Sequence, residues 1–247
     1  KSKIHVIAGT YPKEQDMIFE MESVVKVFEK YGIKVFRPKV IENYNQIFSR
    51  DIGFVIEDKF ITANILPDRD LEISAIDHVL DQIPKENRIS LPEDCHVEGG
   101  DVMPWNNYIF IGTYSGKDYP EYITARTNVN AVKAIQELFP TKIVKSFELR
   151  KSNDNAKENA LHLDCCFQPI GKDKAILHQN GFLIEEEFNW LVDFFGKENV
   201  FEISKDEMYQ MNSNVFSISE NIIVSEQSFT RLNFWLVEKG FTVEEVP

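Results

Sequence analysis

"DVMPWNNYIFIGT", residues 101–113, decides the fold of this 247-residue chain. Its apolar and polar residues alternate on both sides of the pair Asn106-Asn107, which is typical of a β-hairpin. Residues 128–139, "NVNAVKAIQELF", follow with apolar residues at helical spacing, and residues 142–149, "KIVKSFEL", read as another strand. This part of the chain therefore predicts a module made of a hairpin, a helix and a strand.

The same order of elements recurs along the chain. Three further copies begin with the hairpins "FVIEDKFITAN" (54–64), "LHLDCCFQPIGKDKAILHQ" (161–179) and "NSNVFSISENIIVSE" (212–226). Their helices are expected over 71–83, 185–195 and 228–239, and Gly196 and Gly240 offer the left-handed residue that commonly ends a helix. The repeat of roughly 50–60 residues indicates a radial or stacked architecture. Because no Pro-, Gly- or Ser-rich linker separates the copies, we expect one domain over residues 1–247.

The first forty residues predict part of a fifth module. "KIHVIAG" (3–9) reads as a strand, residues 13–31 as a helix and "GIKVFRP" (32–38) as a strand, so that one hairpin strand is lacking. A ring of modules could take that strand from the C-terminal end of the chain. The last predicted strand ends close to Pro247, and an unpaired strand edge is an aggregation hazard. We therefore expect a C-terminal strand beyond the printed sequence.

Composition narrows the function. The chain is 43% apolar and 27% charged, with no long apolar run and no signal peptide, which is typical of a soluble globular protein without a membrane span. A net charge of −13 argues against nucleic acids and anionic membranes as partners. The three cysteines, Cys95, Cys165 and Cys166, predict no disulfide framework and fit a reducing cytoplasm. No zinc-binding spacing occurs, so neither a metal nor a cofactor is expected. The sequence leaves open whether the protein forms a homo-oligomer.

Polar residues gather at the starts of the hairpins. Asp51, Asp101 and His162 hold comparable places in three modules, and equivalent positions of a ring converge on its centre. His162 and Asp164 would share one face of a strand because they are two residues apart. Glu98 precedes two glycines that allow a close approach of the main chain. The predicted cluster of carboxylates around one imidazole would shift the pKa values of its members.

Such a cluster requires a cation, and a guanidinium suits it better than a metal. The guanidinium is planar and matches carboxylates two hydrogen bonds at a time, whereas one histidine without repeated ligand spacing is a poor metal site. Taken singly, each motif also fits an ordinary structural role: "EGGD" (98–101) as a glycine-rich strand entry, "HLD" (162–164) as a satisfied core pair. Arg126 could merely flank an N-cap at Thr127, and the paired cysteines could be small buried apolar residues.

The ordered set of motifs is more specific than any one of them. "N-x-x-F-x-x-D" (Asn45, Phe48, Asp51), "EGGD", "ARTN" (125–128) and "HLD" follow one another in an order that resembles the guanidino-group-modifying enzymes. That superfamily includes arginine deiminases, dimethylarginine dimethylaminohydrolases and glycine amidinotransferases, and the resemblance covers nearly the whole chain. It implies the pentein fold, an α/β propeller of five ββαβ modules around a pseudo-fivefold axis, which agrees with the repeat.

The resemblance implies roles for individual residues. Asp51 and Asp164 would hold the substrate guanidinium, His162 would be the general acid and base, and Glu98 would hold and polarise His162. Asn45 and Phe48 would contact the substrate. The expected clamp on a substrate carboxylate is Arg126, assisted by Arg69 in "LPDRDLE" (66–72), although the stretch "SGKDYPEYIT" (115–124) is longer than the usual connection before this arginine.

The nucleophile implied by the resemblance is a cysteine near the C-terminus of these enzymes. Neither Cys165 nor Cys166 occupies that position, so we expect the nucleophile C-terminal to Pro247. The predicted reaction is hydrolysis of a guanidino C–N bond in arginine or an N-substituted arginine through a thiouronium adduct. Two alternatives stay open: an amidinotransferase that passes the amidino group to an amine, and a non-catalytic relative that only binds its ligand. The exact substrate is not specified by these motifs.

Overall fold

The computed structural model of the chain describes residues 6–44 and 46–247. Strands in these residues form four three-stranded sheets, each built from consecutive strands of the sequence. In every sheet the first two strands pair antiparallel as a hairpin, and the third pairs parallel with the second after a helical crossover. The four predicted modules of hairpin, helix and strand are therefore confirmed.

The bounds of the elements follow the repeat. The strands are β1 Gly53–Ile56, β2 Lys59–Thr62, β3 Arg88–Ser90, β4 Val102–Trp105, β5 Tyr108–Thr113, β6 Ile143–Glu148, β7 Phe167–Ile170, β8 Lys174–Leu177, β9 Val200–Glu202, β10 Phe216–Ser219, β11 Ile222–Glu226 and β12 Thr242–Val246. The α-helices are α2 Glu14–Lys30, α3 Leu71–Ser74, α4 Asp77–Leu80, α5 Val129–Leu138, α6 Glu185–Phe195, α7 Lys205–Tyr209 and α8 Thr230–Glu238. Short 3₁₀ helices are η1 Pro67–Arg69, η2 Lys85–Asn87, η3 Gly99–Asp101, η4 Ala156–Glu158, η5 Leu163–Cys165, η6 Gln179–Gly181 and η7 Lys197–Asn199.

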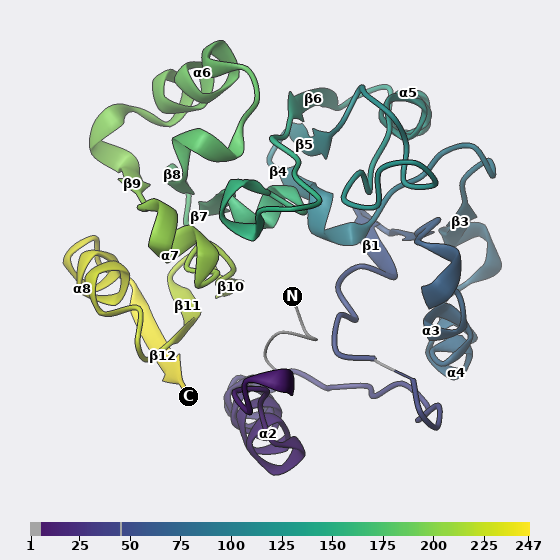
Figure 1. Cartoon of the computed structure of the whole chain (residues 1–247), viewed down its shortest axis with the longest axis horizontal. Coiled ribbons are helices and arrows are strands. Elements are labelled where there is room, and N and C mark those ends of the chain that lie inside the picture. Colours follow the sequence, from purple (N-terminus) through teal and green to yellow (C-terminus); the bar gives the residue numbers. More distant parts are fainter. Residues whose placement is uncertain (1–5, 45) are drawn as a thin grey trace.

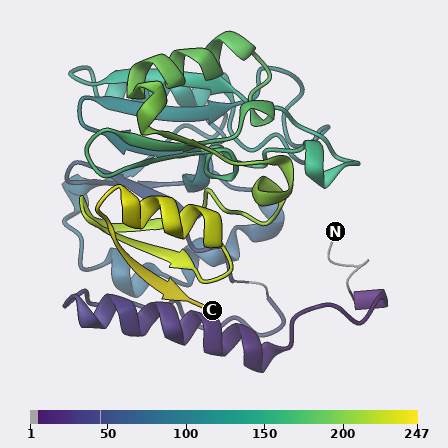
Figure 2. The ribbon, with the colours of Figure 1, turned by 90° about the vertical axis from the view of Figure 1, so that its left-hand side faces the viewer.

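The modules follow one another around an arc, with the helices outside the strands (Figure 1). Single β-bridges join neighbouring modules, from Asn64 to Val97 and from Leu149 to Phe182. Helix α2 lies between the two ends of the arc and runs beside the C-terminal module (Figures 1 and 2). As a result, the entries to the first strands of successive modules are directed toward a shared centre.

The hydrophobic core crosses the module boundaries. Phe110 of β5 packs edge-on against Phe167 of β7, with 5.4 Å between ring centroids, and Phe147 of β6 lies 6.2 Å from Phe167. All three are fully buried, in one cluster with Phe188 and Leu191 of α6. Edge-to-face aromatic pairs add about 0.5–1.5 kcal/mol each to the free energy of burial. This shared packing fixes the position of one module relative to the next.

The N-terminal part differs from the sequence prediction. The helix predicted over 13–31 is confirmed as α2, but residues 32–40 form no strand and the described residues 6–8 belong to a helical turn. A strand requires a partner strand for its backbone N–H and C=O groups, and no strand of the described residues pairs with this segment. Lys39 N donates a 2.8 Å hydrogen bond to Ala75 O, outside any sheet. Helix α2 has no buried residue; it is attached through Phe28, whose ring lies 5.0 Å from Phe216, and through Lys30, which donates a 2.6 Å hydrogen bond to Glu244.

Two local predictions also need correction. The single helix expected over 71–83 is divided into α3 and α4, because Ile76 adopts φ −105° and ψ 8°, outside the helical region. Residues 163–165, predicted as strand, form η5 instead. By contrast, Gly196 and Gly240 have φ values of +82° and +88° directly after α6 and near the end of α8, as the helix-ending signals predicted.

Membrane insertion through a helix has no candidate in this structure. Across residues 6–44 and 46–247, every helix is too short or too polar to span a bilayer.

Candidate active site

The predicted acid–base residues occupy equivalent places in three modules. Asp51 precedes β1, Glu98 precedes η3 and β4, and His162 precedes η5 and β7. All three side chains are buried, with Glu98 fully inaccessible. A main-chain hydrogen bond of 3.0 Å from Gly99 N to Asp51 O joins the first two entries. The convergence expected from the repeat is thus built by direct contacts between module entries.

Glu98 and His162 form the closest pair of the site. Glu98 Oε2 lies 2.6 Å from His162 Nε2, within hydrogen-bonding distance. Asp51 Oδ1 lies 3.8 Å from the other ring nitrogen, Nδ1. The imidazole therefore stands between two carboxylates from two different modules, an arrangement that stabilises its charged form.

The two glycines of "EGGD" are required by close packing, since neither has a positive φ. A Cβ on Gly99 would lie 2.1 Å from the main-chain oxygen of Arg50. A Cβ on Gly100 would lie 2.9 Å from His162 Cγ and Nδ1, and 3.1 Å from Asp164 Oδ2. Gly100 thus allows the imidazole and the second carboxylate to rest on the backbone of the neighbouring module.

Replacing Gly99 by alanine is expected to lower the free energy of unfolding by about 1–3 kcal/mol, the usual cost of overpacking. The clash is with backbone, which cannot rotate away. Urea unfolding measures the loss. Gly116→Ala is the matched control, because its Cβ would meet only the side chain of Tyr114. Equal losses for the two variants would contradict the packing argument.

Asp164 reaches the same pocket, although by a different local structure from the one predicted. His162 has an extended backbone, with φ −131° and ψ 171°, and Asp164 lies on the 3₁₀ turn that follows. The two side chains meet at Gly100 rather than on one face of a strand. Asp164 Oδ2 lies 3.0 Å from Arg50 Nε, and the Ser213 hydroxyl donates to its main-chain oxygen.

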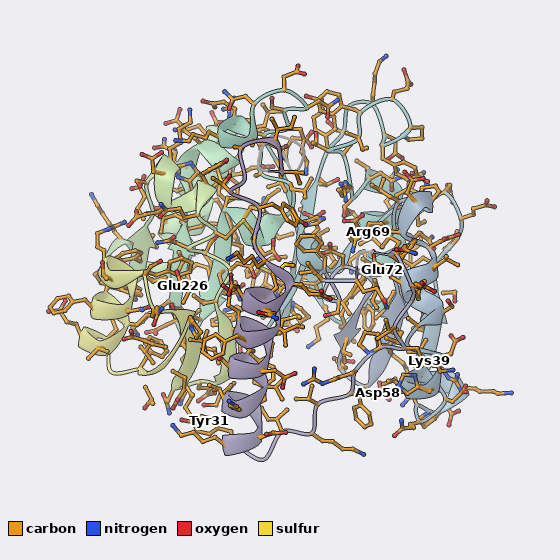
Figure 3. The ribbon with its side chains drawn as sticks, turned by 60° about the horizontal axis from the view of Figure 1, so that its bottom comes forward. Tyr31, Lys39, Asp58, Arg69, Glu72 and Glu226 are labelled. Atoms are coloured by element: carbon orange, nitrogen blue, oxygen red, sulfur yellow. The ribbon has the colours of Figure 1, made fainter. Side chains whose placement is uncertain are left out.

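Arg69 does not extend outward as a free carboxylate clamp. Its Nη1 donates a 2.8 Å hydrogen bond to Asp51 Oδ2, and Nε and Nη2 bind both oxygens of Glu72 at 2.7 and 2.9 Å. The guanidinium carbon lies 5.8 Å from the centre of the Phe48 ring. Arg69 and Glu72 appear side by side in Figure 3. The chain's own guanidinium therefore occupies contacts that were predicted for a substrate.

Arg126 also points into the site. Its Nη1 donates to both oxygens of Glu98 at 3.0 Å, and its Nε donates to the main-chain oxygen of Ile123 at 2.7 Å. This arginine closes the side of Glu98 that His162 leaves free. Of the remaining predicted contact residues, Phe48 is about half exposed beside Arg69, whereas Asn45 lies outside the described residues.

The protonation states follow from these contacts. Burial opposes the charge on His162, but the hydrogen bond that His162 donates to Glu98 and the charges of Asp51 and Asp101 raise the pKa of His162 to about 9. Burial likewise opposes the charge on Glu98, yet the hydrogen bond to His162 and the nearby Arg126 and Arg69 lower the pKa of Glu98 to about 2. At neutral pH the pair is an imidazolium and a carboxylate.

Asp164 shows the opposite tendency. Burial raises the pKa of Asp164 above its usual value, although the charges of Arg50 and His162 oppose this rise. A cation bound next to Asp164 would favour its ionised form. The cluster thus combines a strongly acidic carboxyl, a protonated imidazole and a carboxyl whose pKa is raised by burial.

Sequence reasoning missed several participants. Arg50, Glu72 and Lys151 all contact the predicted residues or the main chain beside them. Only the spacing of Arg69 and Glu72, three residues apart at the start of a helical stretch, carried a signal for an ion pair. The others depend on contacts between modules that no local pattern records.

The cluster of Asp51, Glu98 and His162 also has the composition of a metal site, with ligand atoms within 4.8 Å of one another. Their lone pairs are already engaged, however. Arg69 Nη1 lies 2.8 Å from Asp51 and 3.6 Å from Glu98, and Glu98 accepts further hydrogen bonds from Arg126 and His162. A cation added here would meet charged groups of the same sign.

The cysteines lie behind the pocket. Cys165 and Cys166 are buried, and Cys166 Sγ lies 3.6 Å from the main-chain oxygen of Leu163. Burial raises the pKa of Cys165 to about 12 and that of Cys166 well above its usual value. A thiol becomes a nucleophile through its thiolate, so these two are poorly suited to attack.

Comparison with known proteins gives one family. The sequence model of the N,N-dimethylarginine dimethylhydrolase family, eukaryotic, matches residues 11–238. Among curated proteins, the uncharacterized protein YkgA of Bacillus subtilis (strain 168) is 28% identical over 204 residues, or 81% of this chain and 63% of the relative. The chain therefore spans less than two thirds of the length of that relative.

Solved structures show the same fold. Dimethylarginine dimethylaminohydrolase from Pseudomonas aeruginosa, a cysteine-to-serine mutant complexed with citrulline, has a TM-score of 0.76 at 16% identity, covering 96% of this chain and 83% of its own. The N-terminal domain of ArgZ, an arginine dihydrolase from the ornithine-ammonia cycle in Cyanobacteria, as a cysteine-to-serine mutant bound to substrate, has a TM-score of 0.73 at 17% identity, covering 92% and 79%. The pentein fold expected from the motifs is that of these neighbours.

Proposed function

Because this chain belongs to the N,N-dimethylarginine dimethylhydrolase family, we propose that it hydrolyses a C–N bond of a guanidino compound, either arginine or an N-substituted arginine. The observation that supports this most strongly is the buried Glu98–His162 pair, 2.6 Å apart, beside the carboxylates of Asp51 and Asp164. An acid–base group next to two carboxylates suits a cationic substrate whose departing amine must be protonated. The products would be a ureido compound such as citrulline and ammonia or an amine.

Two carboxylates bind the substrate in this proposal. Asp51 and Asp164 come from different modules, Asp51 lies 3.8 Å from His162 Nδ1, and Asp164 and His162 both pack on Gly100, so a guanidinium bound by the two carboxylates would lie near His162. The three arginines already bound to Asp51, Glu98 and Asp164 support this assignment, because they show that the carboxylates accept guanidinium groups. We assign contacts with the substrate to Phe48 and Asn45; Arg126 and Arg69, whose guanidinium groups lie on Glu98 and Asp51, are not assigned to the substrate carboxylate.

The reaction would proceed in two half-reactions. A thiolate attacks the guanidino carbon, the C–N bond breaks, and the His162 imidazolium gives its proton to the departing amine. The thiouronium adduct remains on sulfur. His162, now neutral, removes a proton from water, and the resulting hydroxide attacks the same carbon. The thiolate then leaves, and the ureido product forms as the hydroxyl proton of the intermediate is lost to solvent. Glu98 stabilises the imidazolium before the first step and after the second.

We propose a cysteine C-terminal to Pro247 as the nucleophile, on a segment that also completes a fifth module around α2. The result would be a single domain with a ring of five ββαβ modules. The raised pKa values of Cys165 and Cys166 support a nucleophile other than these two cysteines. The cysteine-to-serine changes in the citrulline complex and in the substrate complex of the structural neighbours agree with it. A reducing cytoplasm would keep such a thiol free.

The test is an assay of ureido product and of ammonia over a panel of guanidino compounds, with and without glycine or ornithine as acceptor. The protein is the full-length chain with its terminal cysteine. Ureido product without an acceptor is the expected result. Product only with an acceptor would identify an amidinotransferase, and binding without turnover in either arm would leave a ligand-binding protein.

The alkaline limit of kcat/KM should report on His162. The first step needs the protonated imidazole, whose pKa is raised to about 9, so kcat/KM should fall as the pH rises through about 9. Glu98→Gln removes the negative partner and lowers that pKa, which shifts the fall toward neutral pH. Glu207→Gln breaks a 2.6 Å ion pair with Arg231 on another part of the chain and serves as control. An unchanged profile in Glu98→Gln would remove His162 from the acid role.

Replacing Cys165 or Cys166 by alanine should leave the chemical step intact. Both thiols are buried and held protonated, so the expected change is a packing void that costs about 1 kcal/mol of unfolding free energy. Turnover of the full-length variants and their urea unfolding measure the two effects. Cys95→Ala, a buried cysteine of another core cluster, gives the reference for the void alone. Complete inactivation of a folded Cys165 or Cys166 variant would show that the nucleophile has been misassigned.

A further inference from the structure

Two charged side chains without a part in the proposed chemistry bind the main chain on either side of His162. After it, Asp101 Oδ1 accepts a 2.8 Å hydrogen bond from Leu163 N. Before it, Lys151 Nζ donates to the main-chain oxygens of Ala160 at 3.0 Å and Leu161 at 2.7 Å. His162 therefore lies between two main-chain segments, one bound by Asp101 and the other by Lys151.

The surroundings of Asp101 leave it one position. The carboxylate is completely inaccessible, and its other oxygen accepts a 2.7 Å hydrogen bond from the hydroxyl of Thr127. On the opposite side, a Cβ on Gly112 would lie 2.4 Å from Asp101 Oδ1, so that only glycine leaves space for the carboxylate. Asp101 is therefore fixed both by its hydrogen bonds and by packing.

Lys151 and Asp101 also stabilise each other's charges. Burial raises the pKa of Asp101 and lowers that of Lys151, and in each case the charge of the other residue opposes the effect of burial. Buried charges are costly and add little stability compared with apolar residues of similar volume. Because Asp101 and Lys151 bind the main chain on both sides of His162, we infer that these charges fix the position of the main chain and do not add to stability.

We propose that Asp101 and Lys151 are positioning residues that clamp the main chain around His162 and keep its imidazole aligned with Glu98. The imidazole has to stay within hydrogen-bonding distance of Glu98 on one side and face the substrate on the other. A misplacement of about 1 Å in such a group lowers turnover by roughly 100-fold. The proposal rests on the proposed function for its kinetic consequences only.

The first test is Lys151→Met in the full-length protein. The variant keeps the length of the side chain and loses both hydrogen bonds to the main chain. We expect kcat to fall roughly 10- to 100-fold with little change in KM, and the Leu163 amide to exchange with solvent roughly tenfold faster. Lys142→Met is the matched control. Lys142 also donates a 3.0 Å hydrogen bond to a main-chain oxygen, that of Asn106 in the turn between β4 and β5.

Asp101→Asn separates charge from position and covers the case in which a lysine variant fails to fold. Asparagine has the same volume and still accepts the hydrogen bond from Leu163 N, so exchange of that amide should stay unchanged. Since the charge of Asp101 raises the pKa of His162, the alkaline limb of kcat/KM should move to lower pH. Asp101→Ala, which also loses the acceptor, should show both the shift and the faster exchange.

The exchange and titration readouts do not require turnover. NMR titration follows the pKa of the His162 imidazole, whose signal is identified by its loss in His162→Asn. This measurement works even in a protein that processes none of the guanidino panel. Failure of the proposed function can therefore be distinguished from failure of the clamp. Unchanged exchange of the Leu163 amide in Lys151→Met and Asp101→Ala would overturn the clamp, as would loss of kcat equal to that in Lys142→Met.

Discussion

His162→Ala should lower turnover of the full-length enzyme by roughly 10²–10⁴-fold, the usual effect of losing a general acid–base group. The loss is expected at the upper end because one imidazole serves both half-reactions. The variant should still fold, since Arg126 keeps both hydrogen bonds to Glu98 and the buried carboxylate does not become unpaired. Ureido product and ammonia are measured at saturating substrate, with KM determined separately.

His96→Asn is the control for this substitution. His96 also makes a 2.6 Å contact with a carboxylate, from Nδ1 to Asp118 Oδ2, and both side chains are partly exposed. Its loss removes a histidine–carboxylate pair of the same length without touching the pocket, so turnover should stay close to that of the unmodified enzyme. Equal losses in the two variants would mean that stability, and not proton transfer, limits activity.

Asp51→Asn should lower kcat/KM by roughly 30- to several-thousand-fold. Removing the charge of one partner in a buried, hydrogen-bonded ion pair costs about 2–5 kcal/mol, and about 1.4 kcal/mol corresponds to a factor of ten. The fold should tolerate the change because Arg69 keeps both hydrogen bonds to Glu72. Binding of methylguanidine, followed by calorimetry, isolates the guanidinium contact from the rest of the substrate.

Asp81→Asn provides the comparison with an exposed ion pair. Asp81 lies 3.3 Å from Arg88, and its side chain is 76% exposed. Exposed pairs contribute about 1 kcal/mol or less, and neither Asp81 nor Arg88 is among the predicted site residues. Methylguanidine affinity that is equal in Asp51→Asn and the unmodified protein would remove Asp51 from the guanidinium site.

The repeat made much of the fold predictable. Alternation in 101–113 and helical spacing in 128–139 are local properties, and they agree with the bounds of β4, β5 and α5. Once the repeat is known, equivalent positions must lie near one another, which is why Asp51, Glu98 and His162 could be brought together before any coordinates. The strand predicted over 32–38 is wrong because strand formation depends on a partner strand, and no strand of the described residues pairs with this segment.

Side-chain pairing was harder to predict than position. Arg69 and Arg126 were correctly expected near the site, but their inward direction follows from the depth of Asp51 and Glu98, which are buried and need counter-charges. The contact of Lys151 with the main chain before His162 involves residues that share no motif. Such contacts depend on how one module rests on the next, and this information is spread over the whole core.

The inward arginines give the carboxylates of the site their own set of counter-ions. Arg69 lies on Asp51 and Glu72, Arg126 and His162 lie on Glu98, and Arg50 lies beside Asp164. Binding of a guanidinium ligand would then be an ion exchange, in which the ligand replaces an arginine side chain on a carboxylate. Potassium and ammonium offer no planar fork of donors, so they gain less than a guanidinium by such an exchange. Ammonium released by the proposed reaction would for the same reason bind weakly, because each carboxylate is already paired with an arginine or with His162.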